Sequence, residues 1–282
     1  MKIAIASGKG GTGKTTVATN LAFVAAGAGR SVHLLDCDVE EPNCHIFVKP
    51  AFERAEPVCV PVPKVDEARC TGCGECAAAC QFKAIACLNK KVITFPEMCH
   101  GCGACWIVCP EEAISQDQRE VGVLEEGTAL GFRFTQGRLR VGEAMSPPLI
   151  RKVKAAANEA QLTIIDAPPG TSCPVVMAIK GSDFVCLVTE PTPFGLNDLM
   201  LAVAVVRELK LPMGIVINRA DIGDGRVREY CRSKRIPLLA EIPDDRRVAE
   251  AYSRGRMVCE AVPEMKAVFE SLLSAIERCA RR

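Results

Sequence analysis

A glycine-rich stretch near the start of the chain has the residue types and spacing needed to hold phosphate. Residues 8–16 read Gly-Lys-Gly-Gly-Thr-Gly-Lys-Thr-Thr and lie between an apolar run, residues 3–6, and a segment with helical character, residues 17–22. Glycines let several backbone N–H groups approach one anion, and the helix adds its free amides and the positive end of its dipole. The order strand, loop, helix predicts a triphosphate-binding loop, with Lys14 at the β- and γ-phosphates and the Thr15 hydroxyl on Mg²⁺. The residues expected to bind the nucleotide here are Gly8, Gly10, Gly11, Thr12, Gly13, Lys14, Thr15 and Thr16.

Eight of the 17 cysteines form two runs of identical spacing, Cys-x2-Cys-x2-Cys-x3-Cys, in which each cysteine recurs 29 positions later. The spacing resembles that of a bacterial two-cluster ferredoxin, in which three close thiolates and one distant thiolate hold each 4Fe–4S cluster. Zinc sites usually pair two Cys-x2-Cys hooks, so zinc is the weaker interpretation. One departure is Gln81, which follows Cys80 where the ferredoxin pattern usually has proline. The resemblance implies that Cys70, Cys73, Cys76 and Cys109 bind one cluster and that Cys99, Cys102, Cys105 and Cys80 bind the other.

Length and composition restrict the class of protein. The chain has 282 residues, 49% hydrophobic and 24% charged, which allows one large α/β domain or two domains. The net charge of +1 gives no overall field that would recruit nucleic acid, and we expect none as a partner. No apolar stretch reaches the ~18 residues that span a bilayer. Because no signal peptide is recognisable, we expect a reducing cytoplasm, where clustered cysteines indicate metal or redox chemistry rather than disulfides.

Lys9, inside the glycine-rich loop, narrows the family. The loop resembles the deviant Walker A motif of the MinD/ParA/Mrp class of P-loop ATPases, which includes the nitrogenase iron protein. The resemblance implies a doubly wound, mostly parallel α/β sheet. It also implies an ATP-bridged homodimer in which Lys9 reaches the partner's ATP.

The same resemblance assigns roles to residues at the ends of predicted strands. Asp38, which closes the Asp-Cys-Asp sequence after residues 31–35, would contact the Mg²⁺ shell and orient the attacking water, with support from Asp36. Asp166, at the end of residues 162–166, would bind Mg²⁺ through water. Gly170 would sense the γ-phosphate, and Asn218 with the Pro243-Asp244 turn would hold the adenine. The expected catalytic residues are Lys9, Lys14, Asp38 and Asp166, and the expected Mg²⁺ site is Thr15, Asp38 and Asp166.

The ATPase family pattern contains no counterpart of the two cysteine runs, so we expect them in an inserted domain. We place a small α+β ferredoxin-like insert at residues 63–118, entered rigidly through Pro61 and Pro63, within an ATPase domain of residues 1–62 and 119–282. Residues 44–62 show no clear pattern, and residues 121–124 and 132–134 predict short strands.

Cys173 lies at about the offset of a cluster ligand in the nitrogenase iron protein, but its companion cysteine has no counterpart. We therefore expect Cys173 to be a small buried residue. Mrp-type carriers use a late Cys-x2-Cys pair, and none occurs outside the two runs. The favoured interpretation is an ATP-hydrolysing, ATP-gated redox or electron-transfer protein with two 4Fe–4S clusters and an unidentified redox or iron–sulfur partner. The alternatives are an iron–sulfur assembly or carrier ATPase and a ParA/MinD-like positioning ATPase.

Overall fold

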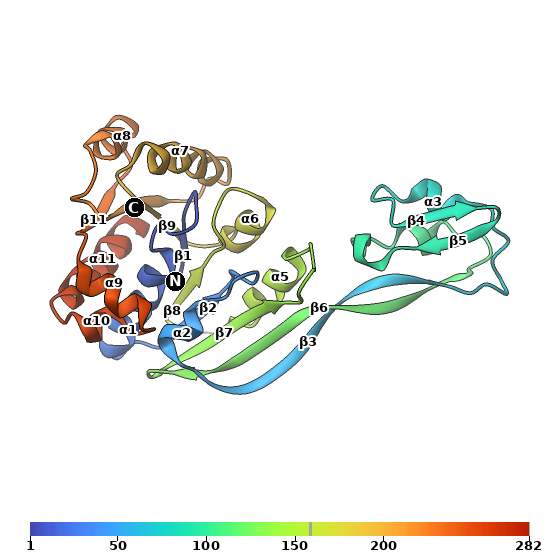
Figure 1. The fold of residues 1–282 in the computed structure, drawn as a ribbon, viewed down its shortest axis with the longest axis horizontal. Helices are drawn as coiled ribbons and strands as arrows, with labels where there is room; N and C mark the ends of the chain where they lie inside the picture. Colours follow the sequence, from blue (N-terminus) through green and yellow to red (C-terminus); the bar gives the residue numbers. More distant parts are fainter. Residues whose placement is uncertain (158–159, 282) are drawn as a thin grey trace.

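The computed structural model describes residues 1–157 and 160–281, and within them one nine-stranded sheet forms the body of the molecule (Figure 1). Neighbouring strands from β11 to β7 run parallel, whereas β6 and β3 extend the sheet in antiparallel fashion. The mostly parallel α/β sheet agrees with the prediction. In spatial order the strands are β11 (Leu238–Ile242), β10 (Met213–Asn218), β9 (Phe184–Thr189), β1 (Lys2–Ala6), β8 (Leu162–Asp166), β2 (Val32–Asp36), β7 (Phe132–Leu139), β6 (Ile114–Ala129) and β3 (Ala51–Val65).

Helices cover both faces of the parallel strands, because the side chains of a central strand point alternately to two apolar layers. In β1, Ile3 and Ile5 pack into one layer, and Ala4 and Ala6 pack into the other. The first layer is completed by α1 (Lys14–Gly27), α2 (Cys44–Val48), α10 (Val258–Ala261) and α11 (Met265–Ala280), with α9 (Arg246–Ser253) beside α10. The second is completed by α5 (Pro147–Ala155), α6 (Cys173–Ile179), α7 (Pro193–Glu208) and α8 (Arg226–Lys234).

Strands β3 and β6 form a long two-stranded ribbon that leaves the body of the molecule (Figure 1). Its ladder runs from the pair Ala51–Thr128 to the pair Val65–Ile114, which is on the order of 45 Å at ~3.3 Å per residue. The prediction of short strands at residues 121–124 and 132–134 was therefore wrong in length. Most of the outer half of β6 is polar and exposed, so its strand conformation comes from pairing with β3 rather than from a hydrophobic pattern.

The ribbon's outer strand, β3, contains three prolines, Pro57, Pro61 and Pro63. Proline has no N–H to give to a ladder and is tolerated on an edge strand. An edge without these donors is also a poor template for pairing with another chain. The prolines thus fit an exposed, isolated ribbon.

The cysteine runs lie in a compact head at the tip of the ribbon, residues 66–113 (Figure 1). Its internal repeat is visible in the backbone. Gly72 and Gly74 have φ angles of 68° and 83°, and their counterparts Gly101 and Gly103 have 66° and 81°. Each pair opens a short helix that carries a cysteine. The head contains α3 (Glu75–Ala79), β4 (Ile85–Leu88), β5 (Lys91–Thr94), the 3-10 turn η1 (Pro96–Met98) and α4 (Ala104–Ile107).

The ribbon completes this head. In the β4–β5 hairpin Ile85 pairs with Thr94. In the ribbon, Val65 pairs with Ile114. Ile114 lies 29 positions after Ile85, and Val65 lies 29 positions before Thr94, so the two pairs occupy equivalent places in the repeat. The tip of the ribbon is therefore the second hairpin of the repeat. The predicted limits of the insert, residues 63 and 118, both fall inside the ribbon strands, and those limits stay a prediction.

Candidate functional site

A cavity of about 330 Å³ opens where the parallel strands end. Gly10, Gly11 and Gly13 of the glycine-rich loop, together with Lys14, line one end. The other end is lined by residues that follow β10 and β11, including Asn218, Pro243 and Asp244. The structure thus brings together the residues expected at the phosphates and those expected at the adenine, although they are about 200 positions apart in the sequence.

The glycines of the loop have different tasks. A Cβ on Gly8 would lie 2.1 Å from the carbonyl oxygen of Asp198 in α7, so this glycine permits close packing of the loop on a helix. A Cβ on Gly13, whose φ is 93°, would lie 2.4 Å from the amide nitrogen of Asn218. A Cβ on Gly10 or Gly11 would meet no atom within 4 Å, because both positions face the open space of the cavity. Thr12 is buried, and its carbonyl accepts a hydrogen bond from Asn218 at 2.9 Å.

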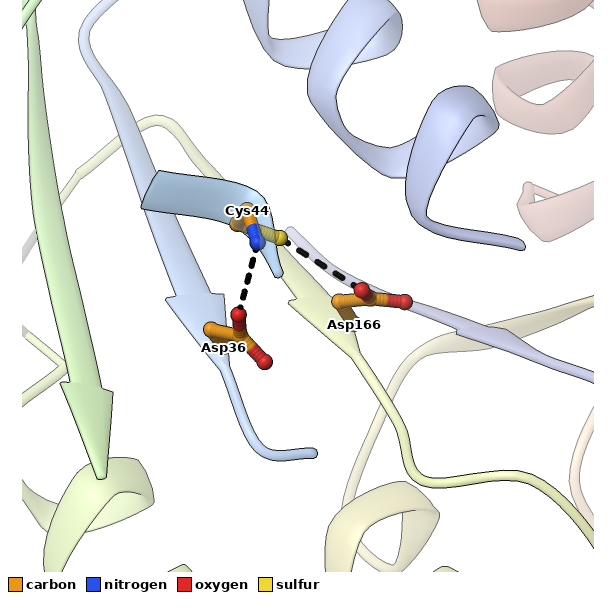
Figure 2. A group of neighbouring side chains, drawn as sticks. All are labelled: Asp36, Cys44 and Asp166. Atoms are coloured by element: carbon orange, nitrogen blue, oxygen red, sulfur yellow. Dashed lines mark hydrogen bonds between the residues drawn. The ribbon is translucent and has the colours of Figure 1, made fainter. Parts of the chain in front are cut away.

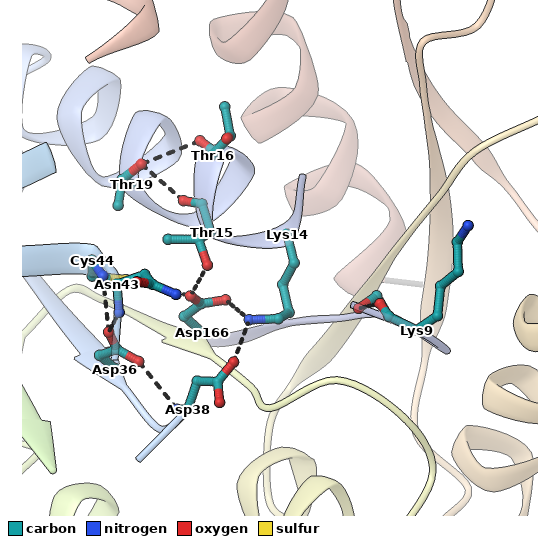
Figure 3. A network of polar contacts seen from close by, with 11 residues as sticks. Lys9, Lys14, Thr15, Thr16, Thr19, Asp36, Asp38, Asn43, Cys44 and Asp166 are labelled. Atoms are coloured by element: carbon teal, nitrogen blue, oxygen red, sulfur yellow. Dashed lines mark hydrogen bonds and ion pairs between the residues drawn. The ribbon is translucent and has the colours of Figure 1, made fainter. Parts of the chain in front are cut away.

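Lys14 and Thr15 are both bonded to Asp166 (Figure 3). The Lys14 ammonium lies 2.8 Å from Asp166 Oδ1 and 3.5 Å from Asp38 Oδ2. The Thr15 hydroxyl donates to Asp166 Oδ2 at 2.6 Å. Thr16 lines the cavity beside them. A triphosphate with Mg²⁺ would have to take over these contacts, because the same ammonium and hydroxyl are the groups expected to bind it.

Negative charge exceeds positive charge at this centre. Burial, together with Asp166, raises the pKa of Asp36 to about 7. Burial also raises the pKa of Asp38 to about 6, although Lys14 opposes this. Burial alone would lower the pKa of Lys14, but Asp166 and Asp38 outweigh it and raise that pKa. Carboxylate and hydroxyl oxygens are the ligands that Mg²⁺ takes in proteins, so the donor set of Thr15, Asp38 and Asp166 fits that ion.

Asp36 organises the segment that follows β2 (Figure 2). Its Oδ2 accepts hydrogen bonds from the backbone N–H groups of Asn43 and Cys44 at 3.1 and 3.0 Å. Its Oδ1 accepts from the N–H of Asp38 at 3.1 Å, which places Asp36 in the supporting position expected for it. Asp36, Cys44 and Asp166 lie close enough to hold a metal ion, but backbone amides already occupy both oxygens of Asp36. We therefore assign Asp36 the role of fixing the backbone of residues 38–44 rather than that of a metal ligand.

The Cys44 thiol donates to Asp166 Oδ2 at 3.4 Å (Figures 2 and 3). Sequence reasoning missed this contact, because nothing in residues 44–62 distinguishes Cys44 from the other cysteines. Cys44 begins α2, and α2 leads directly into β3 of the ribbon. Cys44 thus links Asp166, which bonds Lys14 and Thr15 of the cavity, to the helix that leads into the ribbon.

Two further expected residues, Lys9 and Gly170, contact groups outside the centre of Lys14 and Asp166. The Lys9 ammonium lies 3.2 Å from Glu190 of the same chain, away from Lys14 (Figure 3). Gly170, at φ 96°, donates its N–H to the carbonyl of Ser7 at 2.9 Å. The expectation that Cys173 is buried was wrong. It is the exposed first residue of α6, and this short helix buries Val175, Ala178 and Ile179 instead.

Four cysteines of the head, one of them from the second run, line a single small cavity; they are Cys70, Cys73, Cys76 and Cys109. In the other set, burial raises the pKa of Cys105 to about 11, and the neighbouring thiols of Cys99 and Cys102 add to this effect. Cys80 packs against the apolar cluster that contains Cys99. No disulfide joins the cysteines that the structure describes.

The trailing cysteine of each run receives the same backbone hydrogen bond. The N–H of Ala84 donates to Cys80 Sγ, and the N–H of Ala113 donates to Cys109 Sγ, both at 3.3 Å. Hydrogen bonds to sulfur are a general feature of iron–sulfur sites, where they tune the reduction potential. The cavity brings thiols of both runs together, and each run has a backbone N–H aimed at its trailing sulfur, an arrangement that fits thiolate ligation of a cluster.

Residues 3–258 match the family described as the CobQ/CobB/MinD/ParA nucleotide binding domain. An uncharacterized protein of Methanocaldococcus jannaschii is 31% identical over 258 residues, which is 90% of each chain. An iron-sulfur cluster carrier protein of Pyrococcus horikoshii is 25% identical over 286 residues, covering 95% of this chain and 83% of the relative. The septum site-determining protein MinD of the same organism, solved with Mg-ADP, shares the fold, with a TM-score of 0.63 and 21% identity over 99% of this chain and 97% of that one.

The chain therefore belongs to the CobQ/CobB/MinD/ParA family of nucleotide-binding P-loop domains. None of the helices in the described part of the chain has the length and apolar character required to cross a bilayer.

Proposed function

We propose that this protein is an ATP-hydrolysing, nucleotide-bridged homodimer whose nucleotide state controls electron transfer by two 4Fe–4S clusters in the head. The observation that carries this proposal is the chain of contacts from Lys14 through Asp166 and Cys44 to α2, which leads into the ribbon that completes the head. A passive tether between two independent domains would need no such ladder.

In the ATPase, Lys14 binds the β- and γ-phosphates once it leaves Asp166, and Asp38 orients the water that attacks the γ-phosphate. Thr15, Asp38 and Asp166 would hold Mg²⁺, and the ion would neutralise charge on the transferring phosphoryl group. Asn218, Pro243 and Asp244 hold the adenine. The reaction is ATP + H₂O to ADP + phosphate. Its support is the convergence of these side chains on one cavity.

In the head, Cys70, Cys73, Cys76 and Cys109 hold one cluster, and Cys99, Cys102, Cys105 and Cys80 hold the other. Such clusters supply one-electron transfer when bound. The four-cysteine cavity, the paired N–H to Sγ bonds and the matched glycine conformations support a ferredoxin-like inserted domain.

A second set of contacts joins the segment after β2 to the other strand of the ribbon. The Ser146 hydroxyl donates to Glu40 at 3.0 Å, and the N–H of Met145 donates to Glu143 at 3.0 Å. Glu143 forms a buried ion pair with Arg119 of β6. Breaking a buried ion pair costs much free energy, so Glu143 and Arg119 are expected to move together. A nucleotide-driven shift of residues 38–44 would therefore act on both β3 and β6.

Coupling of this kind is reciprocal, so reduction of the clusters must change nucleotide affinity. We expect the dissociation constant of a Mg-bound non-hydrolysable ATP analogue to differ between oxidised and dithionite-reduced protein. Ser146→Ala removes the contact with Glu40 and should shrink that difference. Ser233→Ala, which removes a hydroxyl bonded to Tyr230 on the surface of α8, should not. The proposal would be contradicted if the analogue bound equally well to oxidised and reduced protein and the cluster potentials were the same with and without nucleotide.

Iron–sulfur cluster carriage is the second candidate, because relatives over nearly the whole chain carry the name iron-sulfur cluster carrier protein. In that case the clusters are cargo. Incubation with an apo-ferredoxin distinguishes the two functions: a carrier loses iron to the acceptor, and a redox protein with eight cysteine ligands keeps it.

A further inference from the structure

Lys9 is part of a row of alternating charges. Its ammonium lies 3.2 Å from one carboxylate oxygen of Glu190. The other oxygen of Glu190 accepts from Arg219 Nη1 at 3.1 Å, and Arg219 Nε lies 3.6 Å from Asp244 Oδ1. Glu190 follows β9 and Arg219 follows β10, so neighbouring strand ends hold the two residues in place.

The far end of this row lies in the nucleotide cavity. Arg219 and Asp244 both line it, next to Asn218. The glycine-rich loop with Lys9 lies at the near end. Glu190 is 8% exposed and has one cation on each carboxylate oxygen, so the two cations compete for the same buried charge. The row thus connects the adenine end of the cavity to Lys9.

We propose that Glu190 is a positioning residue that retains Lys9 within its own chain until nucleotide enters, and that Arg219 transmits the entry. A base placed beside Asp244 competes with Arg219 for that carboxylate. Arg219 then turns its planar guanidinium fully onto Glu190, because a guanidinium can bind both oxygens of a carboxylate at once. Lys9 loses its partner and becomes available to a second copy of the chain. The inference rests on the proposed action of Lys9 across the dimer.

The retaining contact is weak enough to be reversible. The Lys9 side chain is 32% exposed, and ion pairs at such positions contribute little free energy. We therefore expect each Lys9–Glu190 contact to change the dimerisation equilibrium about threefold. Counted from the nucleotide-free monomers, formation of the nucleotide-bound dimer breaks two of these contacts, one in each chain. Removal of the Glu190 charge should therefore tighten the nucleotide-dependent dimer about tenfold.

The test is sedimentation velocity of the full chain with Mg²⁺ and a non-hydrolysable ATP analogue, under anaerobic conditions, at an analogue concentration below saturation, so that release of Lys9 still contributes to the measured dimer dissociation constant. Glu190→Gln should lower the dimer dissociation constant about tenfold, and Lys9→Ala in the same chain should abolish that gain. Glu190→Asp, which keeps the charge, should behave more like the wild type. The matched control is Glu241→Gln, which removes a surface pair with Arg228 and should change nothing.

Each outcome has a defined meaning. An unchanged or weaker dimer in Glu190→Gln overturns the retaining role, even when the wild type dimerises on adding nucleotide. A gain that survives Lys9→Ala assigns the effect to something other than Lys9 and also overturns it. A wild-type chain that stays monomeric with nucleotide contradicts the proposed dimer itself, and the retaining role with it.

Discussion

Replacement of Gly8 by alanine should destabilise the fold, although the residue belongs to a loop expected to bind phosphate. The new Cβ would lie 2.1 Å from the carbonyl oxygen and 2.4 Å from the carbonyl carbon of Asp198. These atoms are backbone of α7, which is fixed by buried side chains such as Leu199 and Val203. Overpacking typically costs about 1–3 kcal/mol, and a clash with helix backbone belongs at the upper end, about 3 kcal/mol.

For a domain of this size, 1 kcal/mol shifts the melting temperature by about 2–4 °C, so Gly8→Ala should lower it by about 6–12 °C. The assay is thermal unfolding followed by circular dichroism without nucleotide. Gly10→Ala is the matched control, because a Cβ there meets nothing within 4 Å. That variant should melt like the wild type and bind ATP more weakly, since its methyl group enters the phosphate space. Equal melting temperatures for Gly8→Ala and the wild type would refute the reasoning.

Two further predictions concern the clusters and the charged centre. Cys109→Ser should remove the cluster of Cys70, Cys73 and Cys76 and so reduce the iron content from about eight to about four per chain. Iron and sulfide analysis with electron paramagnetic resonance (EPR) measures this. Loss of the Cys99 cluster instead would contradict the assignment of one ligand of each cluster to the other run. Because burial raises the pKa of Asp36 to about 7 and that of Asp38 to about 6, the folded nucleotide-free protein binds protons that the unfolded chain, with carboxyl pKa near 3.9, does not. These two groups therefore add stability that declines as pH rises from about 4 to about 7, so melting should occur at a higher temperature at pH 6 than at pH 8, and Mg-ATP should reduce the difference. A nucleotide-free melting temperature that rises over this range would contradict it.

The sequence predicted the parts of the site in which residue type and strand–loop–helix order carry the chemistry. Lys14 and the remote Asn218 line one cavity, and Asp166 at the end of its strand bonds Lys14, because carboxyl ends of parallel strands share an edge. The core-facing stripe of α11, including Phe269 and Leu272, could also be predicted from its helical spacing.

The ribbon could not be predicted, because its strands depend on each other. Residues 114–120 are mostly polar and exposed, and only the register with β3 makes them a strand. The contacts of Cys44 and Glu190 were missed for a related reason. Each joins segments more than 100 positions apart through a side chain that no local pattern marks. The coupling proposal depends on the Cys44 contact, and the retaining role of Glu190 depends on the contact with Lys9.

The central claim is that nucleotide and clusters act on each other through the ribbon. An EPR-monitored redox titration of the anaerobic protein, with and without Mg-ATP, tests it most directly. The account predicts about eight irons per chain and a midpoint potential or reduced-cluster spectrum that shifts when Mg-ATP is added, with a smaller shift in Ser146→Ala. Identical potentials and spectra in both conditions would contradict coupling and leave cluster carriage as the better explanation, and zinc in place of iron would contradict the cluster assignment itself.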